Sequence, residues 1–128
     1  MALNILVVDD SAVMRAMIIK TLRLSGIPLG ETFQAANGAE GLQALESNWV
    51  DLVLVDLNMP VMDGETMIKC MQQTPATKDI PIIVVSTESS QSRIDLLEKI
   101  TSGFVQKPFT PETLRDIITA ATGGAHAE

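Results

Sequence analysis

The stretch VDLNMPVMDG, residues 55–64, closes an apolar run and opens a turn that contains proline and glycine. The apolar run, LVLV at 52–55, is continuous rather than alternating, which favours a β-strand covered on both faces. Asp56 follows that run directly. Taken alone, Asp56 is an adequate polar turn residue at the end of a strand, so its neighbours in the fold must decide whether it also reacts.

Two further apolar runs resemble 52–55, namely ILVV at 5–8 and IIVV at 82–85. Both are short and rich in Val and Ile, so they also predict buried strands. Weaker patterns predict two more strands, at 33–37 and 103–106. The sequence therefore predicts five strands.

Segments with helical spacing lie between and after these strands. Apolar residues recur at 14, 17, 18 and 22, at 67, 68 and 71, and at 114, 117, 118 and 121. Shorter helices are predicted at 38–46 and 91–100, and Thr110-Pro111 is a typical helix start. Strands that alternate with helices indicate an α/β fold, a doubly wound parallel sheet with helices on both faces.

Length and composition limit the class of protein. The 128 residues suffice for one domain, predicted at 1–122, with a glycine-containing tail at 123–128. A formal net charge of −7 argues against nucleic acid as the main partner. No apolar run approaches the about 20 residues that span a bilayer, and the N-terminus is not that of a secretory signal. Cys70 has no second cysteine, so we expect no disulfide and a cytoplasmic location.

Polar side chains follow four of the predicted strands, where parallel strands present their carboxyl ends to one edge of a sheet. Each has an ordinary structural reading: Asp10 or Ser11 can cap a helix, and Lys107 can be a surface lysine. Their conjunction at one edge is harder to explain as accident. These residues are Asp9, Asp10, Ser11, Asp56, Ser86, Thr87 and Lys107.

Gathering three carboxylates requires compensating positive charge. Two carboxylates about 4 Å apart repel by about 4 kcal/mol at an effective dielectric constant near 20. Lys107 supplies one positive charge, and a divalent cation would supply the rest. Mg²⁺ suits oxygen ligands, whereas zinc is disfavoured because the one histidine, His126, lies in the tail. A carboxylate beside Mg²⁺, a hydroxyl and an ammonium group is equipped for phosphoryl transfer, with Asp56 as nucleophile.

These motifs together resemble the receiver domain of two-component response regulators, from about Asn4 to Thr122. The matching elements are Asp9-Asp10, DLNMPVMDG at 56–64, Ser86-Thr87 and KPF at 107–109. The resemblance implies a flavodoxin-like sheet of five parallel strands in the order 2-1-3-4-5, flanked by five helices. The stretch SAVMRAM at 11–17 is most similar to single-domain chemotaxis regulators.

The resemblance also implies roles for individual residues. Asp56 would accept a phosphoryl group from the phosphohistidine of a sensor kinase or phosphotransfer protein. Ser86 and Lys107 would hold that group, Phe104 would be a switch aromatic, and the Lys107-Pro108 bond would be cis. The implied Mg²⁺ ligands are Asp9, Asp10, Asp56 and the backbone carbonyl of Asn58.

The resemblance places the output surface on the helix at 91–100, the strand at 103–106 and the helix after Thr110. A downstream protein would bind there, the chain would be a monomer that can dimerise on phosphorylation, and it would catalyse only its own phosphorylation and dephosphorylation. One departure falls in this region: the segment between Ser86 and Lys107 is about one residue shorter than is usual in the family.

Three alternatives stay open on the sequence. The chain can be a receiver fragment of a larger regulator. An aspartyl-nucleophile phosphatase is disfavoured, because Asn58 stands where such enzymes carry a second aspartate. A nucleotide- or flavin-binding module is disfavoured, because no glycine-rich phosphate motif follows a strand. We interpret the methionines as core residues and assign no function to Trp49; those methionines are 14, 17, 59, 62, 67 and 71.

Overall fold

Five strands and five helices alternate along residues 2–123, the part of the chain that the computed structural model describes. The elements are β1 (Leu3–Val8), α1 (Ala12–Leu24), β2 (Leu29–Ala35), α2 (Gly38–Ser47), β3 (Leu52–Val55), α3 (Gly64–Gln73), β4 (Ile82–Ser86), α4 (Gln91–Ile100), β5 (Gly103–Gln106) and α5 (Pro111–Ala121).

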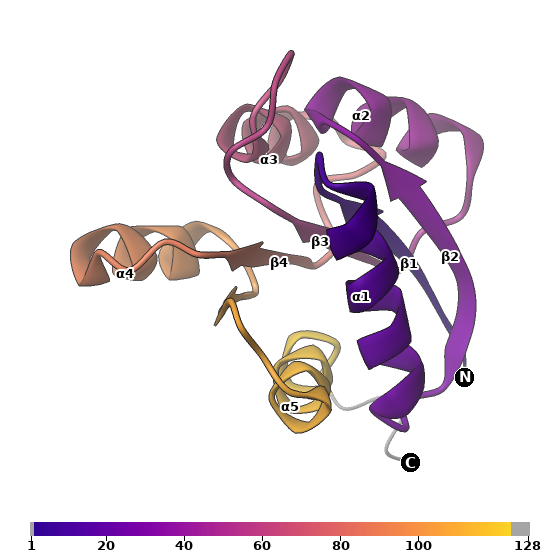
Figure 1. Ribbon diagram of the computed structural model, residues 1–128. Coiled ribbons are helices and arrows are strands. Elements are labelled where there is room, and N and C mark those ends of the chain that lie inside the picture. The colour runs from indigo at the N-terminus through magenta and orange to yellow at the C-terminus, as the bar shows by residue number, and fades with distance from the viewer. Residues whose placement is uncertain (1, 124–128) are drawn as a thin grey trace.

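All five strands are parallel and form one sheet in the order β2-β1-β3-β4-β5. Helices α1 and α5 pack on one face of the sheet, and α2, α3 and α4 lie on the other side (Figure 1). This doubly wound α/β fold confirms the predicted class and strand order.

The core consists of two apolar layers, one on each face of the sheet. Consecutive residues of a central strand point to opposite layers, so Ile5 and Val7 of β1 pack under α1 and α5, whereas Leu6 and Val8 pack under α2 and α3. All four are buried. Because both faces are covered, the central strands are continuous apolar runs, which is why the sequence revealed them.

The register of the sheet places the polar residues that follow the strands side by side. Val8 of β1 pairs with Val55 of β3. The residues that follow them, Asp9 and Asp56, therefore lie next to each other at the carboxyl edge of the sheet. The backbone N–H of Asp56 donates to the carbonyl of Val8, at 2.9 Å. The sheet therefore brings together two carboxylates that are 47 positions apart in the sequence.

Side-chain caps begin the helices that border this edge. Ser11 starts α1 by accepting a hydrogen bond from the N–H of Met14, at 3.1 Å, so Asp10 is not the cap. Asp63 starts α3 by accepting from Thr66, at 2.9 Å, and this bond lowers the pKa of the Asp63 carboxyl. Thr110 starts α5 with Pro111 at the first helical position, as predicted.

Strand β2 differs from its prediction. The sequence predicts residues 33–37, whereas the strand spans Leu29–Ala35 and Asn37 instead caps α2. Its first residues include Gly30 and Glu31, which have low strand propensity, and they are extended because Leu3 of β1 pairs with Leu29. The predicted strand at 103–106 and helix at 91–100 are confirmed with the same bounds.

The methionines show a second difference. Met67 and Met71 are fully buried, but Met17 is 53% exposed, so its interpretation as a core residue is wrong. Ile18 and Leu22 form the buried apolar face of α1, and Met17 lies beside that face on the solvent side. Of the predicted tail at 123–128, residues 124–128 lie outside the described residues. Within residues 2–123, the helices lack the length and apolar character needed to cross a bilayer.

Candidate functional site

Three carboxylates meet at the carboxyl edge of the sheet. Asp9 and Asp10 follow β1 and Asp56 follows β3, and each offers an oxygen within 4.8 Å of the others. Asp9 is buried, with 2% of its surface exposed, whereas Asp10 is exposed. The cluster therefore reaches from the protein interior to solvent.

Lys107 contacts two carboxylates of this cluster. Its Nζ lies 2.9 Å from Oδ2 of Asp9 and 3.3 Å from Oδ2 of Asp56. Burial alone would lower the pKa of Lys107, but its hydrogen bond to Asp9 and the charges of Asp56 and Asp9 outweigh burial and raise the pKa above 10.5. The ammonium group is therefore charged at neutral pH and bridges two carboxylates.

Burial raises the pKa of the Asp56 carboxyl, and the charge of Asp9 raises it further. A hydrogen bond from the N–H of Leu57 to Oδ1, at 2.8 Å, and the charge of Lys107 oppose that rise. The net effect is a pKa above the usual 3.8. The ionised form of Asp56 is thus less stable in this pocket than it is in water.

Ser86 and Phe104, the predicted switch residues, lie on the neighbouring strands β4 and β5. Ser86 is fully buried, and its Oγ accepts a hydrogen bond from the N–H of Glu88, at 3.1 Å. Its carbonyl accepts from the N–H of Lys107, at 2.8 Å. Phe104 is partly buried against the core layer that α3 and α4 cover. The Lys107-Pro108 bond is cis, as predicted.

The loop after Asp56 folds tightly back toward its own start. The N–H of Gly64 donates to the carbonyl of Leu57, at 3.0 Å. A Cβ at position 64 would collide with the carbonyl oxygen of Asp56, so only glycine fits there. Val61, at the outer tip of the loop, has a φ of 70°, and Asn58 is exposed between the tip and Asp56. The loop is therefore held close to the acidic cluster.

Arg15 also contacts the site, and the sequence did not identify it. From the first turns of α1 its Nη1 donates to the backbone carbonyl of Asp9, at 2.7 Å, and its Nε donates to Oε1 of Gln34, at 2.9 Å. It ties the segment that carries Asp9 to β2. No spacing in the sequence marks Arg15 for this contact, because the contact depends on how α1 lies against the sheet.

The donor set of this pocket fits a magnesium ion. Its groups are carboxylate oxygens, which Mg²⁺ prefers, and Asp10 is exposed, which leaves room for the waters that Mg²⁺ retains. Three carboxylates face one ammonium group in the cluster, so a divalent cation would balance the charge.

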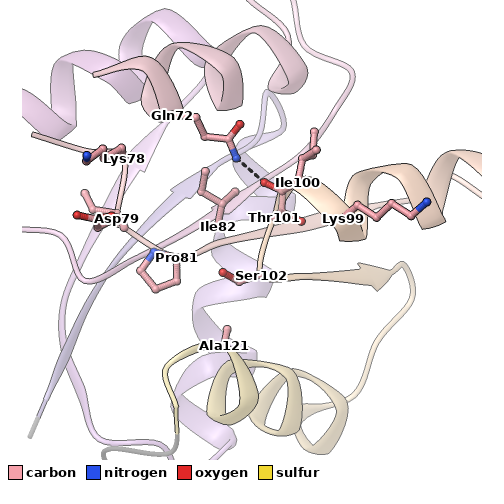
Figure 2. Close-up of a pocket in the computed structure, with 11 residues that line it drawn as sticks. Gln72, Lys78, Asp79, Pro81, Ile82, Lys99, Ile100, Thr101, Ser102 and Ala121 are labelled. Atoms are coloured by element: carbon pink, nitrogen blue, oxygen red, sulfur yellow. Dashed lines mark hydrogen bonds between the residues drawn. The ribbon is translucent and has the colours of Figure 1, made fainter. Parts of the chain in front are cut away.

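A separate hollow of about 420 Å³ lies at the opposite end of β4 and β5, below the C-terminal ends of α3 and α4 (Figure 2). The side-chain amide of Gln72 donates to the carbonyl of Ile100 across its rim. Lys78, Asp79 and Lys99 are exposed there, and Figure 2 shows the Lys99 ammonium group pointing away from the hollow. Because these charges do not converge, the carboxyl edge remains the candidate site.

Fold and site together define a class of protein: a doubly wound α/β domain with an acidic, lysine-containing pocket at the carboxyl ends of its central strands. The chain belongs to the response regulator receiver domain family, which it matches over residues 5–119. Members of this family are in general phosphorylation-controlled signalling switches.

Relatives of the chain include both single-domain and much longer proteins. Chemotaxis protein CheY1 of Helicobacter pylori is 34% identical over 123 residues, covering 94% of this chain and 98% of CheY1. The autoinducer 1 sensor kinase/phosphatase LuxN of Vibrio harveyi is 34% identical over 116 residues, so the match spans 90% of this chain but 13% of LuxN. Chemotaxis response regulator CheY4 of Vibrio cholerae has a similar structure, with a TM-score of 0.82, 32% identity, and coverage of 94% of this chain and 99% of CheY4.

Proposed function

We propose that this chain is a phosphorylation-activated switch in which Asp56 accepts a phosphoryl group in a Mg²⁺-dependent reaction. The observation that carries the proposal is the position of Asp56, whose carboxylate lies beside those of Asp9 and Asp10 and contacts the ammonium group of Lys107. The proposed receiver domain spans residues 1–122, with a tail at 123–128, and acts in the cytoplasm, where the free thiol of Cys70 stays reduced.

The proposed reaction uses the ionised Asp56 carboxylate as nucleophile. One of its oxygens attacks the phosphorus of a phosphohistidine, the new O–P bond gives an acyl phosphate, and the P–N bond breaks with its electron pair returning to the imidazole nitrogen. Lys107, charged and 3.3 Å from Asp56, offsets negative charge on the phosphoryl oxygens. In this proposal the chain catalyses its own phosphorylation and does not turn over a separate substrate.

Asp9, Asp10 and Asp56 would hold the magnesium ion, with the backbone carbonyl of Asn58 as a further ligand. When bound, the ion withdraws charge from the phosphoryl oxygens and from the carboxylates around them. The buried Asp9 is fixed for this task on both of its oxygens, since Oδ1 accepts from the N–H of Ser11 at 2.9 Å and Oδ2 pairs with Lys107 at 2.9 Å.

Ser86 and Phe104 would couple phosphorylation of Asp56 to a conformational change at the protein surface. The Ser86 hydroxyl would donate to the phosphoryl group, and the ring of Phe104 would pack inward as β4 shifts. Val84 of β4 pairs with Phe104 of β5, so the two strands are directly coupled. The proposed output surface, formed by α4, β5 and α5, would then bind a downstream protein.

We propose that the phosphoryl donor approaches Asp56 from the surface beside Lys107. A groove of about 250 Å³ lies there, between α1 and the segment after Lys107, and Met14, Met17 and Phe109 line it. The exposure of Met17 offers an apolar contact for the donor. We propose that a sensor histidine kinase or a phosphotransfer protein docks on this groove. The similarity to CheY1, a chemotaxis protein, favours a chemotaxis pathway.

The match to LuxN supports a second candidate, a receiver that belongs to a longer regulator. The site chemistry would be the same, and the output would pass to a domain in the same protein. Detection of the intact protein in its native cells by mass separates the two candidates.

Intact-mass measurement after incubation with Mg²⁺ and acetyl phosphate tests the proposed phosphorylation. We expect a single phosphate adduct on the wild type that is lost on Asp56→Asn and on chelation of Mg²⁺. Asp51→Asn, which alters the carboxylate before β3, is the matched control and should keep the adduct. An adduct that persists in Asp56→Asn, or no adduct on the wild type, would overturn the proposal.

A further inference from the structure

Ser86 is mechanically linked to the loop before α4 through Glu88. The N–H of Glu88 donates to Oγ of Ser86, at 3.1 Å, and the carbonyl of Glu88 accepts from the side-chain amide of Gln106 on β5, at 3.1 Å. The backbone of Glu88 is therefore held from two sides. If the Ser86 hydroxyl moves toward Asp56, Glu88 must move with it or lose this hydrogen bond.

Arg93, in the first turn of α4, joins the side chain of Glu88 to α3. Its Nε lies 3.2 Å from Oε1 of Glu88, and its Nη2 pairs with Oε1 of Glu65 in the first turn of α3. The planar guanidinium group holds the two carboxylates through separate N–H donors, Nε for Glu88 and Nη2 for Glu65. One arginine thus connects the loop after β4, helix α3 and helix α4.

The two ion pairs of Arg93 are weak enough to break and re-form when the protein changes conformation. The side chains of Arg93, Glu65 and Glu88 are 40%, 34% and 26% exposed, so water partly screens both ion pairs. Such pairs contribute little to global stability. Loss of Arg93 would, however, leave two carboxylates near each other without their shared cation, and it would remove the contact between the first turns of α4 and α3.

We propose that Arg93 is a positioning residue that holds Ser86 and α4 in the unphosphorylated arrangement, acting through Glu88 and Glu65. This inference rests on the proposed function of Asp56 as phosphoacceptor. Arg93 pairs with Glu65 and Glu88 rather than with Asp56, so it would influence the reaction through other residues. Linkage requires that a residue which favours the unphosphorylated arrangement also weakens binding of the phosphoryl group.

The test is a titration of the full chain with beryllofluoride, a phosphoryl mimic, in the presence of Mg²⁺, followed through the backbone amide resonances of α4. Arg93→Met should bind the mimic about two- to fivefold more tightly, the range expected from losing partly exposed ion pairs. Its unliganded α4 resonances should be displaced toward their liganded positions. Arg115→Met, which breaks an exposed pair with Asp116 on α5, is the control and should bind like the wild type.

Measuring Arg93→Met in a Ser86→Ala background shows whether Arg93 acts through Ser86 or has a general effect on the structure. In Ser86→Ala the gain from Arg93→Met should vanish, whereas an equal gain would show that Arg93 does not act through Ser86. Unchanged or weaker binding by Arg93→Met, with normal binding by the wild type, would overturn the inference. Failure of the wild type to bind would instead overturn the proposed function. If Arg93→Met does not fold, Glu65→Gln carries the same expectation.

Discussion

Strand β3 is flanked by two half-buried aspartates, Asp51 at its amino end and Asp56 at its carboxyl end, whose surroundings differ. Both oxygens of Asp51 accept from neutral donors: Oδ2 from the N–H of Asn4, at 2.8 Å, and Oδ1 from the indole of Trp49, at 3.1 Å. Asp56 instead shares a lysine with Asp9, and Asp10 lies close by.

The difference shows how one strand can serve structure at one end and chemistry at the other. At the amino edge the hydrogen bonds of Asp51 join β1 to the segment before β3 and need no ion. At the carboxyl edge negative charge exceeds positive charge within the cluster, so a divalent cation would offset the excess. The effects of substitutions on stability should therefore differ between the two edges in size, in sign and in their dependence on Mg²⁺.

The largest difference is expected from Lys107→Met. This change leaves Asp9, which is 2% exposed, without its cation, and loss of one partner of a buried ion pair costs about 3–5 kcal/mol of unfolding free energy. Asp51→Asn, at the amino edge, should cost about 1 kcal/mol, because the asparagine amide keeps one acceptor oxygen and loses only one of the two hydrogen bonds. Urea unfolding at pH 7 without Mg²⁺ measures both. Equal losses would mean that the carboxylates do not depend on Lys107.

Two glycines provide the next comparison. Gly64→Ala drives a Cβ into the backbone carbonyl of Asp56, which cannot move without opening the loop, and we expect a loss of about 1–3 kcal/mol. Gly30→Ala meets the side-chain oxygen of Asn4, which must move and give up its exposed hydrogen bond from the N–H of Glu31, so the loss should be about 1 kcal/mol. Thermal unfolding ranks the two. Gly64→Ala should also slow phosphorylation by acetyl phosphate, whereas Gly30→Ala should not.

Added Mg²⁺ should stabilise the wild type through the carboxyl edge alone. At about ten times its dissociation constant a ligand adds about 1.4 kcal/mol to the unfolding free energy, seen as a higher Tm. Asp10→Asn should remove most of this gain while Asp51→Asn keeps it. Trp49, which is 79% exposed and lies at the amino edge, should keep its fluorescence on Mg²⁺ binding. A Tm gain that survives Asp10→Asn would place the ion elsewhere.

The smallest effect is expected from Asp56→Asn, and it has the opposite sign. Because burial raises the pKa of Asp56, the ionised group destabilises the fold above that raised pKa, and the penalty vanishes below the ordinary value of 3.8. Without Mg²⁺, Asp56→Asn should therefore raise the Tm at pH 7, and the gain should shrink as the pH falls toward 3.8. Asp51→Asn should lower the Tm at pH 7. A lower Tm for Asp56→Asn would show that Lys107 outweighs burial.

Strands and candidate site residues were predictable because their signals are local in the sequence. Continuous Val- and Ile-rich runs mark strands covered on both faces, and a polar residue directly after such a run marks the carboxyl edge. Strand β2 was predicted less well, since it is an edge strand in which only Ala35 is buried and its start depends on pairing with β1. Met17 was misinterpreted, because a methionine beside an apolar stripe has no sequence signal for exposure.

The sequence by itself determined the α/β class, the alternation of elements and the set of residues that meet at one sheet edge, because strand length, apolar periodicity and caps are short-range properties. The tertiary structure alone decided the register that sets Asp9 beside Asp56, the pairing of Lys107 with both, and the links from Arg15 to Asp9 and from Arg93 to Glu65 and Glu88. Those contacts join residues on different elements, so they depend on how helices lie against the sheet, which no local pattern encodes.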